Sequence, residues 1–196
     1  MKKLIGIIAI LTIIFIYGCS KQPSSIKAKQ DGKPLIVMYG DFKCPYCKKV
    51  EDKVMPKLRN KYIDKNKVKF QYVNLAFIGK DSIIGSRAQQ AVNHYAPKYS
   101  LQFQKLMFEH QKDEDKKWIT HTLIDKQIDK LNISNKTKDK IKTNYKTKNS
   151  TSWKAAKKNK KLGKEHHIKQ TPTVFIEGKK VKDPYDFSSY QKLLEE

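Results

Sequence analysis

The chain has 196 residues and a formal net charge of +23, with 42 lysine and arginine residues against 19 acidic residues. Lysines recur along the whole chain, and those from Lys27 to Lys192 form no single block with interleaved aromatic residues, so the charge does not indicate nucleic acid as a partner. A solvated, lysine-rich surface explains the charge most simply. Anionic phospholipid head groups or wall polymers are the alternative partners.

The first 18 residues have the pattern of an export signal. Lys2 and Lys3 form a positive region, and an apolar run of 14 residues, 4–17, follows. This run is shorter than the roughly 20 residues that a membrane-spanning helix needs. We therefore predict a signal peptide over 1–18, and with it a location outside the cytoplasm, where disulfides persist.

The end of this segment, Ile16-Tyr17-Gly18-Cys19, resembles the lipobox of bacterial lipoproteins, in which a small residue precedes a cysteine that becomes lipidated. The resemblance implies a lipid anchor on Cys19 and a place on the extracytoplasmic face of the cell membrane. A short signal anchor or a plain signal peptide is the alternative. The polar residues 19–33 are predicted to form the lipidated tether, and the folded part is predicted to begin near Pro34.

The most informative stretch is Cys44-Pro45-Tyr46-Cys47, between an apolar run at 35–39 that predicts a buried strand and a helical pattern at 50–62. A sulfur at a helix N-terminus meets unpaired N–H groups and the positive end of the helix dipole, and both favour the thiolate. Pro45 suits the first helical turn, because its missing N–H would be unpaired there. A zinc site would need four ligands, so this context favours a redox-active disulfide between Cys44 and Cys47, with no other cofactor and no metal.

The elements downstream predict a strand–helix–strand unit followed by helices alone. Pro56 predicts a kink or a break near Met55. Alternation at 68–72, continued by an apolar run to Phe77, predicts a second strand. From about residue 84 to residue 162 helical spacing predominates, with no strand signal.

Strand signal returns near the C-terminus, at 171–176. Glu177-Gly178-Lys179-Lys180 is predicted to be a hairpin turn, with the returning strand beginning at Val181. A last helix is predicted to open at Asp186-Phe187, with Asp186 as its N-cap.

This order of elements resembles the thioredoxin fold, and the helical block between its halves resembles that of the DsbA family; Cys44-Pro45-Tyr46-Cys47 and Thr171-Pro172 carry the resemblance. It implies an α/β thioredoxin fold over 34–83 and 165–196, with an inserted helical domain at 84–164. It also implies a cis Thr171-Pro172 bond beside the disulfide, where Thr171 would bind an extended substrate chain. An ordinary trans proline at a strand edge is the alternative.

The resemblance further implies a thiol-disulfide oxidase that donates the Cys44–Cys47 disulfide to unfolded exported proteins with free thiols, as a monomer by default. Two positions depart from the family pattern. Tyr46 stands where strongly oxidising relatives carry histidine, and Met38 stands where thioredoxins and many DsbA proteins bury an acid. An envelope thiol-disulfide reductase is the alternative within this class. A lipoprotein that binds metal through Cys44, Cys47 and a histidine is the alternative from another class.

Two groups of residues near the motifs have an open interpretation. Lys43, Lys48 and Lys49 flank the first motif, either as solvent-exposed residues or as charges that stabilise the Cys44 thiolate. His166-His167 precede the Thr171-Pro172 loop, and they are more simply explained as surface or core residues than as residues of the site.

Overall fold

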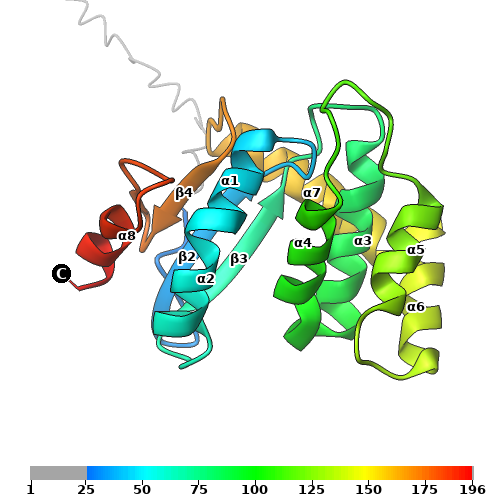
Figure 1. Cartoon of the computed structure of the whole chain (residues 1–196), viewed down its shortest axis with the longest axis horizontal. Helices are drawn as coiled ribbons and strands as arrows, with labels where there is room; N and C mark the ends of the chain where they lie inside the picture. The colour runs from blue at the N-terminus through cyan, green and yellow to red at the C-terminus, as the bar shows by residue number, and fades with distance from the viewer. Residues whose placement is uncertain (1–25, 196) are drawn as a thin grey trace, which may run out of the picture.

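A computed structural model gives the fold and describes residues 26–195 (Figure 1). In this part of the chain the strands are β1 (Lys29–Gln30), β2 (Lys33–Gly40), β3 (Lys69–Asn74), β4 (Thr173–Ile176) and β5 (Lys179–Lys180). The helices are α1 (Pro45–Lys53), α2 (Met55–Leu58), α3 (Ser82–Tyr95), α4 (Ser100–Glu109), α5 (His121–Asp129), α6 (Asn135–Lys146), α7 (Thr151–Glu165) and α8 (Phe187–Leu194), with a π-helical turn η1 (Arg59–Ile63) and a 3-10 turn η2 (Pro97–Tyr99). None of these helices is both long and apolar enough to cross a membrane. The predicted signal peptide and Cys19 lie outside the described residues.

The strand β2 forms the centre of the sheet. It pairs in parallel with β3 and antiparallel with β4, and β4 pairs antiparallel with β5. Met38 of β2 is therefore flanked by Tyr72 of β3 and Val174 of β4. This mixed sheet, with helices on both faces, is the α/β arrangement that the sequence predicts for a thioredoxin fold.

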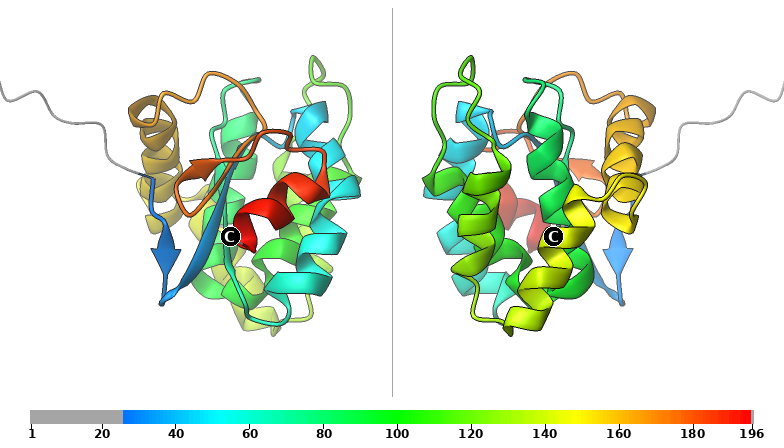
Figure 2. Two further views of the ribbon diagram at one scale, coloured as in Figure 1. Left: turned by 90° about the vertical axis from the view of Figure 1, so that its left-hand side faces the viewer. Right: turned by 90° about the vertical axis from the view of Figure 1, so that its right-hand side faces the viewer.

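Alternation along β2 gives the sheet two buried faces, because successive side chains of a strand point in opposite directions. Ile36 and Met38 belong to the larger core, which α1, α2 and α8 cover, while Val37 and Tyr39 belong to a smaller core under α7. Figure 2 shows the sheet between these two layers. Both faces are covered, which explains why β2 is apolar throughout its length.

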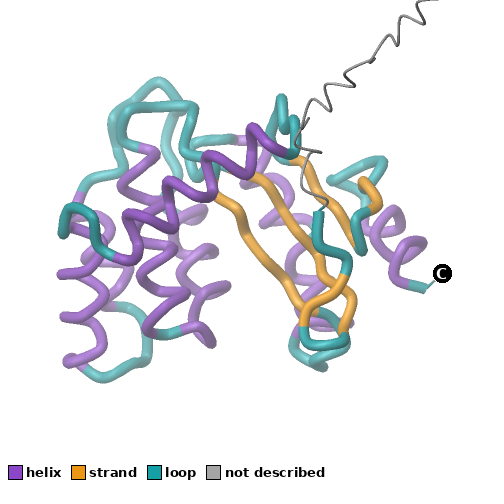
Figure 3. The backbone as a smooth tube through the Cα atoms, turned by 180° about the vertical axis from the view of Figure 1, so that it is seen from behind, coloured by secondary structure: helices purple, strands orange, loops and turns teal. Residues whose placement is uncertain are grey.

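The helix α7 crosses the back of the sheet and packs on β3 (Figure 3). At Gly163 of this helix, a Cβ atom would lie only 2.6 Å from Cδ2 of Leu75. The glycine therefore permits the close approach of α7 to the chain just after β3. Helix α3 packs against both α6 and α7 beside the sheet. Helix α7 therefore packs both on the sheet and on the other helices. The limits predicted for the inserted domain, residues 84 and 164, stay predictions.

The helix break predicted at Pro56 is confirmed. Helix α1 ends at Lys53, Val54 interrupts it, and α2 begins at Met55. The predicted N-cap of the last helix is also confirmed, because the Asp186 side chain accepts a hydrogen bond from the backbone N–H of Ser188.

The folded part begins before Pro34, because the last residues of the tether predicted for 19–33 already form strand β1. Strand β1 pairs with the start of β2 through a two-residue turn, Asp31-Gly32, whose φ angles are 51° and 73°. Two positive φ angles give a turn whose twist matches that of a hairpin. Ile26 also packs against the smaller core. The Asp-Gly pair was the sequence signal for this hairpin.

Two other boundaries differ from the predicted ones. The hairpin after β4 turns on Glu177-Gly178 alone, with φ angles of 49° and 81°, so β5 is already complete before the predicted start at Val181. Strand β3, the second of the predicted strands, ends at Asn74, short of the predicted end at Phe77. There the N–H of Phe77 donates to the Asp41 carboxylate, 2.9 Å away, and does not continue the ladder.

Candidate active site

The sulfur of Cys44 lies at the N-terminus of α1, as the sequence predicts. Cys44 is the N-cap residue, its Sγ accepts a hydrogen bond from the backbone N–H of Cys47 at 3.3 Å, and Pro45 begins the first turn. Both cysteines are free in this structure, and both are buried, with exposed fractions of 3% for Cys44 and 0% for Cys47. Tyr46 between them is 59% exposed.

The environment of Cys44 lowers the pKa of its thiol from 9.0 to about 7. The largest cause is a hydrogen bond from the Cys47 side chain, which outweighs the opposing effect of burial. Thr171 and the backbone N–H groups of Cys47 and Tyr46 add smaller contributions in the same direction. A substantial fraction of Cys44 is therefore thiolate, the reactive form, at neutral pH.

Cys47 has the opposite character. Burial is the largest of the causes that raise its pKa well above 9.0, and the neighbouring Cys44 raises it further. Because one sulfur is activated and the other is held as a thiol, Cys44 is the sulfur suited to attack and to leave, and Cys47 is the sulfur suited to close the disulfide.

The loop that carries Thr171 and Pro172 meets the cysteine pair from the other end of the chain. The Thr171–Pro172 peptide bond is cis, as the resemblance implied. The Cys44 thiol donates to the Thr171 carbonyl oxygen at 3.4 Å, although 127 positions separate the two residues in sequence. The structure thus brings both sequence motifs into one site.

The lysines that flank the motif do not bind the Cys44 sulfur. On the surface of α1, Lys48 forms an ion pair with Asp52, in which Nζ lies 3.0 Å from Oδ2. The Lys49 ammonium lies 4.6 Å from the centre of the Tyr185 ring. Hydrogen bonds, and not these charges, are therefore the cause of the lowered Cys44 pKa.

Lys43 is buried, contrary to the expectation that it is either exposed or close to the thiolate. Its ammonium donates to Asp81 Oδ1 and to the Lys116 carbonyl oxygen, both at 2.9 Å. The other oxygen of Asp81 accepts from the backbone N–H groups of Trp118 and Ile119 at 3.0 Å. Burial raises the pKa of Asp81, but these hydrogen bonds outweigh it and leave that pKa below its ordinary value. The pair ties the residue before Cys44 to the chain between α4 and α5.

Two further side chains hold the same loop. Asp41 is fully buried, and its carboxylate accepts from the backbone N–H of Lys43 at 3.0 Å and from the Ser82 hydroxyl at 2.9 Å. The Gln111 amide donates to the carbonyl oxygens of Phe42 and Cys44, at 2.6 and 3.0 Å. Helix α3 and the segment after α4 therefore position the cysteine loop.

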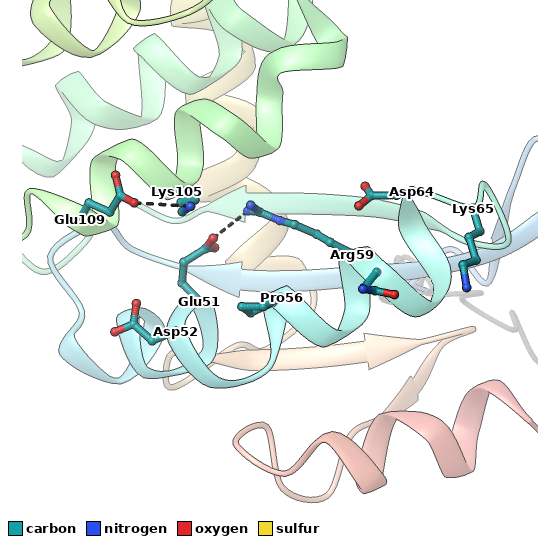
Figure 4. A pocket seen from close by; sticks show the side chains of 9 residues that line it. Glu51, Asp52, Pro56, Arg59, Asp64, Lys65, Lys105 and Glu109 are labelled. Atoms are coloured by element: carbon teal, nitrogen blue, oxygen red, sulfur yellow. Dashed lines mark hydrogen bonds and ion pairs between the residues drawn. The ribbon is translucent and has the colours of Figure 1, made fainter.

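A buried acid lies one turn beyond Cys47 on α1. Glu51 is 5% exposed, and its oxygens accept from Arg59 at 2.7 Å and from Gln104 at 2.8 Å. Burial raises its pKa although Arg59 opposes this. Figure 4 shows Glu51 beside a 640 Å³ pocket between α1, η1 and α4. We did not identify Glu51 from the sequence, although its spacing of four residues from Cys47 places it on the same face of a helix.

His166, which precedes the second motif, contacts Tyr39 and not the cysteines. His166 shares a hydrogen bond with the Tyr39 hydroxyl on the α7 face of the sheet, and burial raises the pKa of Tyr39 to about 12. Among residues 26–195, no group of three or more histidine, cysteine or acidic side chains is arranged to hold a metal ion. In the part of the chain that the structure describes, Cys44 and Cys47 therefore form no metal-binding group with a third histidine, cysteine or acidic side chain.

An activated cysteine at a helix N-terminus, a second buried cysteine one turn away and a cis-proline loop beside them define a dithiol–disulfide exchange site on a thioredoxin fold. Comparison with known proteins agrees with this class. The family model described as thioredoxin matches residues 26–196. Disulfide bond formation protein D of Bacillus subtilis is 30% identical over 181 residues, which cover 90% of this chain and 79% of that protein. The probable disulfide bond formation protein D of Bacillus cereus is 32% identical over 171 residues, 85% of this chain and 75% of that protein.

Solved structures agree with the sequence relatives. The crystal structure of oxidised BdbD from Bacillus subtilis has a TM-score of 0.74 at 29% identity, and the match covers 89% of this chain and 94% of that one. DsbA of Chlamydia trachomatis has a TM-score of 0.69 at 17% identity, covering 88% of this chain and 93% of that one, and this likeness concerns the fold alone. The chain belongs to the DsbA family of thiol-disulfide oxidoreductases, within the thioredoxin-like proteins.

Proposed function

We propose that this oxidoreductase is a lipid-anchored, extracytoplasmic oxidase that donates its Cys44–Cys47 disulfide to exported proteins. The observation that carries the proposal is the Cys44 sulfur, which has a lowered pKa and lies against Thr171 beside the cis-proline. The names of the Bacillus relatives, disulfide bond formation protein D, support the oxidising direction. The cysteine pair is the only redox group that the proposal requires.

The reaction begins with the disulfide closed. A substrate thiolate attacks Cys44 Sγ, the S–S bond breaks, and its electron pair passes to Cys47. A second substrate thiolate then attacks the substrate sulfur of the mixed disulfide, and Cys44 leaves as a thiolate. The substrate loses two electrons and gains a disulfide, while the cysteine pair ends as the dithiol. The lowered pKa of Cys44 makes it a good leaving group in the second step.

Thr171 and Pro172 are proposed to hold the substrate during this exchange. A cis-proline loop at the start of β4 presents backbone groups to an extended chain, which binds as a short added strand. The exposed Tyr46 ring, between Cys44 and Cys47, offers the substrate an apolar contact.

The test is oxidation of a reduced, unfolded ribonuclease by stoichiometric amounts of the oxidised full chain. Recovery of ribonuclease disulfides is expected, and Cys44→Ser is expected to abolish it; oxidase activity that survives Cys44→Ser would remove the mechanism. The reduction potential in glutathione buffers decides the direction. A value above about −180 mV supports the oxidase, and a value near −250 mV or lower supports the envelope reductase.

The proposed anchor has its own test. Cells that express the full chain should incorporate labelled fatty acid into the protein and hold it in the membrane fraction. Cys19→Ser should abolish both results while leaving ribonuclease oxidation by the purified chain unchanged, because Cys19 takes no part in the exchange. Release of unlabelled wild-type protein into the medium would instead support a plain signal peptide.

A further inference from the structure

Tyr72 carries a buried hydroxyl group that the fold does not explain. Its side chain is in the larger core and is 4% exposed, yet the hydroxyl has no hydrogen-bond partner among the described residues. Buried hydroxyl groups in proteins are nearly always hydrogen-bonded, so one without a partner calls for a specific reason. Packing alone would be satisfied equally well by phenylalanine.

The position of Tyr72 in the sheet connects it with the cysteine pair. The parallel register of β2 and β3 places it beside Met38, the position at which the sequence lacks the buried acid found in thioredoxins and many DsbA proteins. Both side chains lie on the face that α1 covers, in the same core as Cys44 and Cys47. The neighbouring strand thus supplies a polar group to a site whose own strand supplies none.

The Tyr72 ring is directed towards the end of β2 that leads into the cysteine loop. A Cβ atom on Gly40 would lie 2.6 Å from the Tyr72 Cε2 atom and 2.8 Å from its hydroxyl oxygen. The hydroxyl therefore lies directly against the backbone at Gly40. The next residue, Asp41, forms the backbone hydrogen bond that lowers the pKa of Cys47. Phe42 and Phe108 pack on the ring at centroid distances of 5.4 and 6.0 Å and fix its place.

The cysteine pair is among the charged groups that act on Tyr72. Burial is the first cause that raises the pKa of Tyr72. Among charged groups, the Cys47 thiolate has the largest effect, followed by those of Asp41, Cys44 and Glu51. Tyr72 consequently remains protonated at neutral pH, and its hydroxyl remains a donor.

We propose that the Tyr72 hydroxyl donates a hydrogen bond to the Cys47 thiolate at the moment when the disulfide opens. This inference rests on the exchange at Cys44–Cys47 proposed above, and it holds for either direction of electron flow. When a substrate thiolate bonds to Cys44, the electron pair of the broken S–S bond passes to Cys47 in a site without a buried acid at Met38. Tyr72 stabilises that buried anion until it takes a proton from water. Tyr72 keeps its own proton throughout.

The test compares the pKa of Cys47 with and without the Tyr72 hydroxyl. In the full chain carrying Cys19→Ser and Cys44→Ser, Cys47 is the only cysteine, and its ¹³Cβ chemical shift reports its titration. Tyr72→Phe should raise the Cys47 pKa by about one to two units, which is roughly ten- to a hundredfold less thiolate at a given pH. The same variant should leave the reduced protein as stable as before or more stable, because the hydroxyl has no partner there.

The matched control is Tyr190→Phe. Tyr190 is equally buried in the larger core, but its hydroxyl donates to the Pro184 carbonyl oxygen at 2.9 Å. This variant should leave the Cys47 pKa unchanged. An unchanged Cys47 pKa in Tyr72→Phe, or an equal rise in both variants, would overturn the proposal.

A nearly isosteric replacement covers the case in which Tyr72→Phe does not fold. Fluorination of the Tyr72 ring, by incorporation of 3-fluorotyrosine at this position, makes the hydroxyl a stronger donor and should lower the Cys47 pKa. A pKa that stays the same or rises contradicts the donor role. These titrations need no substrate, so their failure is distinct from a failure of ribonuclease oxidation, which would refute the proposed function itself.

Discussion

The pH should control both the reactivity of Cys44 and the reduction potential, with a change of behaviour near pH 7. The pKa of Cys44 is lowered from 9.0 to about 7 in the folded chain. A lowered pKa stabilises the reduced, folded protein at pH values above the ordinary pKa of the thiol. This stabilisation is lost as the pH falls through about 7, where Cys44 becomes protonated.

The magnitude follows from the size of the pKa shift. Two pKa units correspond to at most about 2.7 kcal/mol of thiolate stabilisation at high pH, and solvent screening around the sulfur reduces this further. At pH 7 the group is half ionised, so the stabilisation falls to about 0.4 kcal/mol. About 7 kcal/mol separates the potentials of thioredoxin and DsbA. A strongly oxidising potential at pH 7 would therefore have to come mainly from interactions other than those of the Cys44 thiolate.

Two assays measure this effect. The rate of Cys44 alkylation should reach half its maximum near pH 7. The reduction potential should fall by about 59 mV per pH unit below pH 7 and by about 30 mV above it, because one proton fewer accompanies the two electrons there. Cys47→Ala is the matched variant for alkylation: it removes the largest cause of the low pKa and should move the midpoint towards 9. A midpoint near 9 in the wild type, or one below 5, would refute the reasoning.

Three substitutions test the framework and a fourth serves as a control, each by urea unfolding of the reduced chain. Lys43→Ala should reduce the free energy of unfolding by about 3–5 kcal/mol, because it leaves Asp81 buried without its partner. The exposed pair of Lys48 provides the control, and Lys48→Ala should cost less than about 1 kcal/mol. Gly163→Ala should reduce the free energy of unfolding by about 1–3 kcal/mol, since the added methyl group would lie too close to Leu75. Asp186→Ala should cost about 1 kcal/mol by removing the N-cap of α8. Equal losses in the two lysine variants would contradict the importance of burial.

The sequence predicted the parts of the site that have local causes. The position of Cys44 follows from a strand, a short connection and a helical pattern, and all three can be read within about 20 residues. The helix break at Val54 follows from Pro56 in the same way. The pairing of Thr171 with Cys44 needed the family resemblance, because spacing alone does not show that two segments so far apart meet.

The parts that sequence reasoning missed depend on distant contacts. Lys43 was interpreted from its neighbours in sequence, but its partner Asp81 belongs to the loop before α3. The role of Gln111 depends on where the chain after α4 returns to the cysteine loop. Tyr72 belongs to the alternating run that predicts the second strand, and only the register with β2 and the close approach to Gly40 show where its hydroxyl lies.

The site is assembled from segments that are made far apart in time. Thr171 follows Cys44 by 127 positions, so at 5–20 residues per second it is synthesised about 6–25 s later. The pairing of Ile36 with Ile176 has to span the whole helical block, and contacts of such long range form slowly. An incomplete chain thus carries both cysteines without the loop that faces them. The exchange site is complete only when the last strands of the chain have joined the sheet.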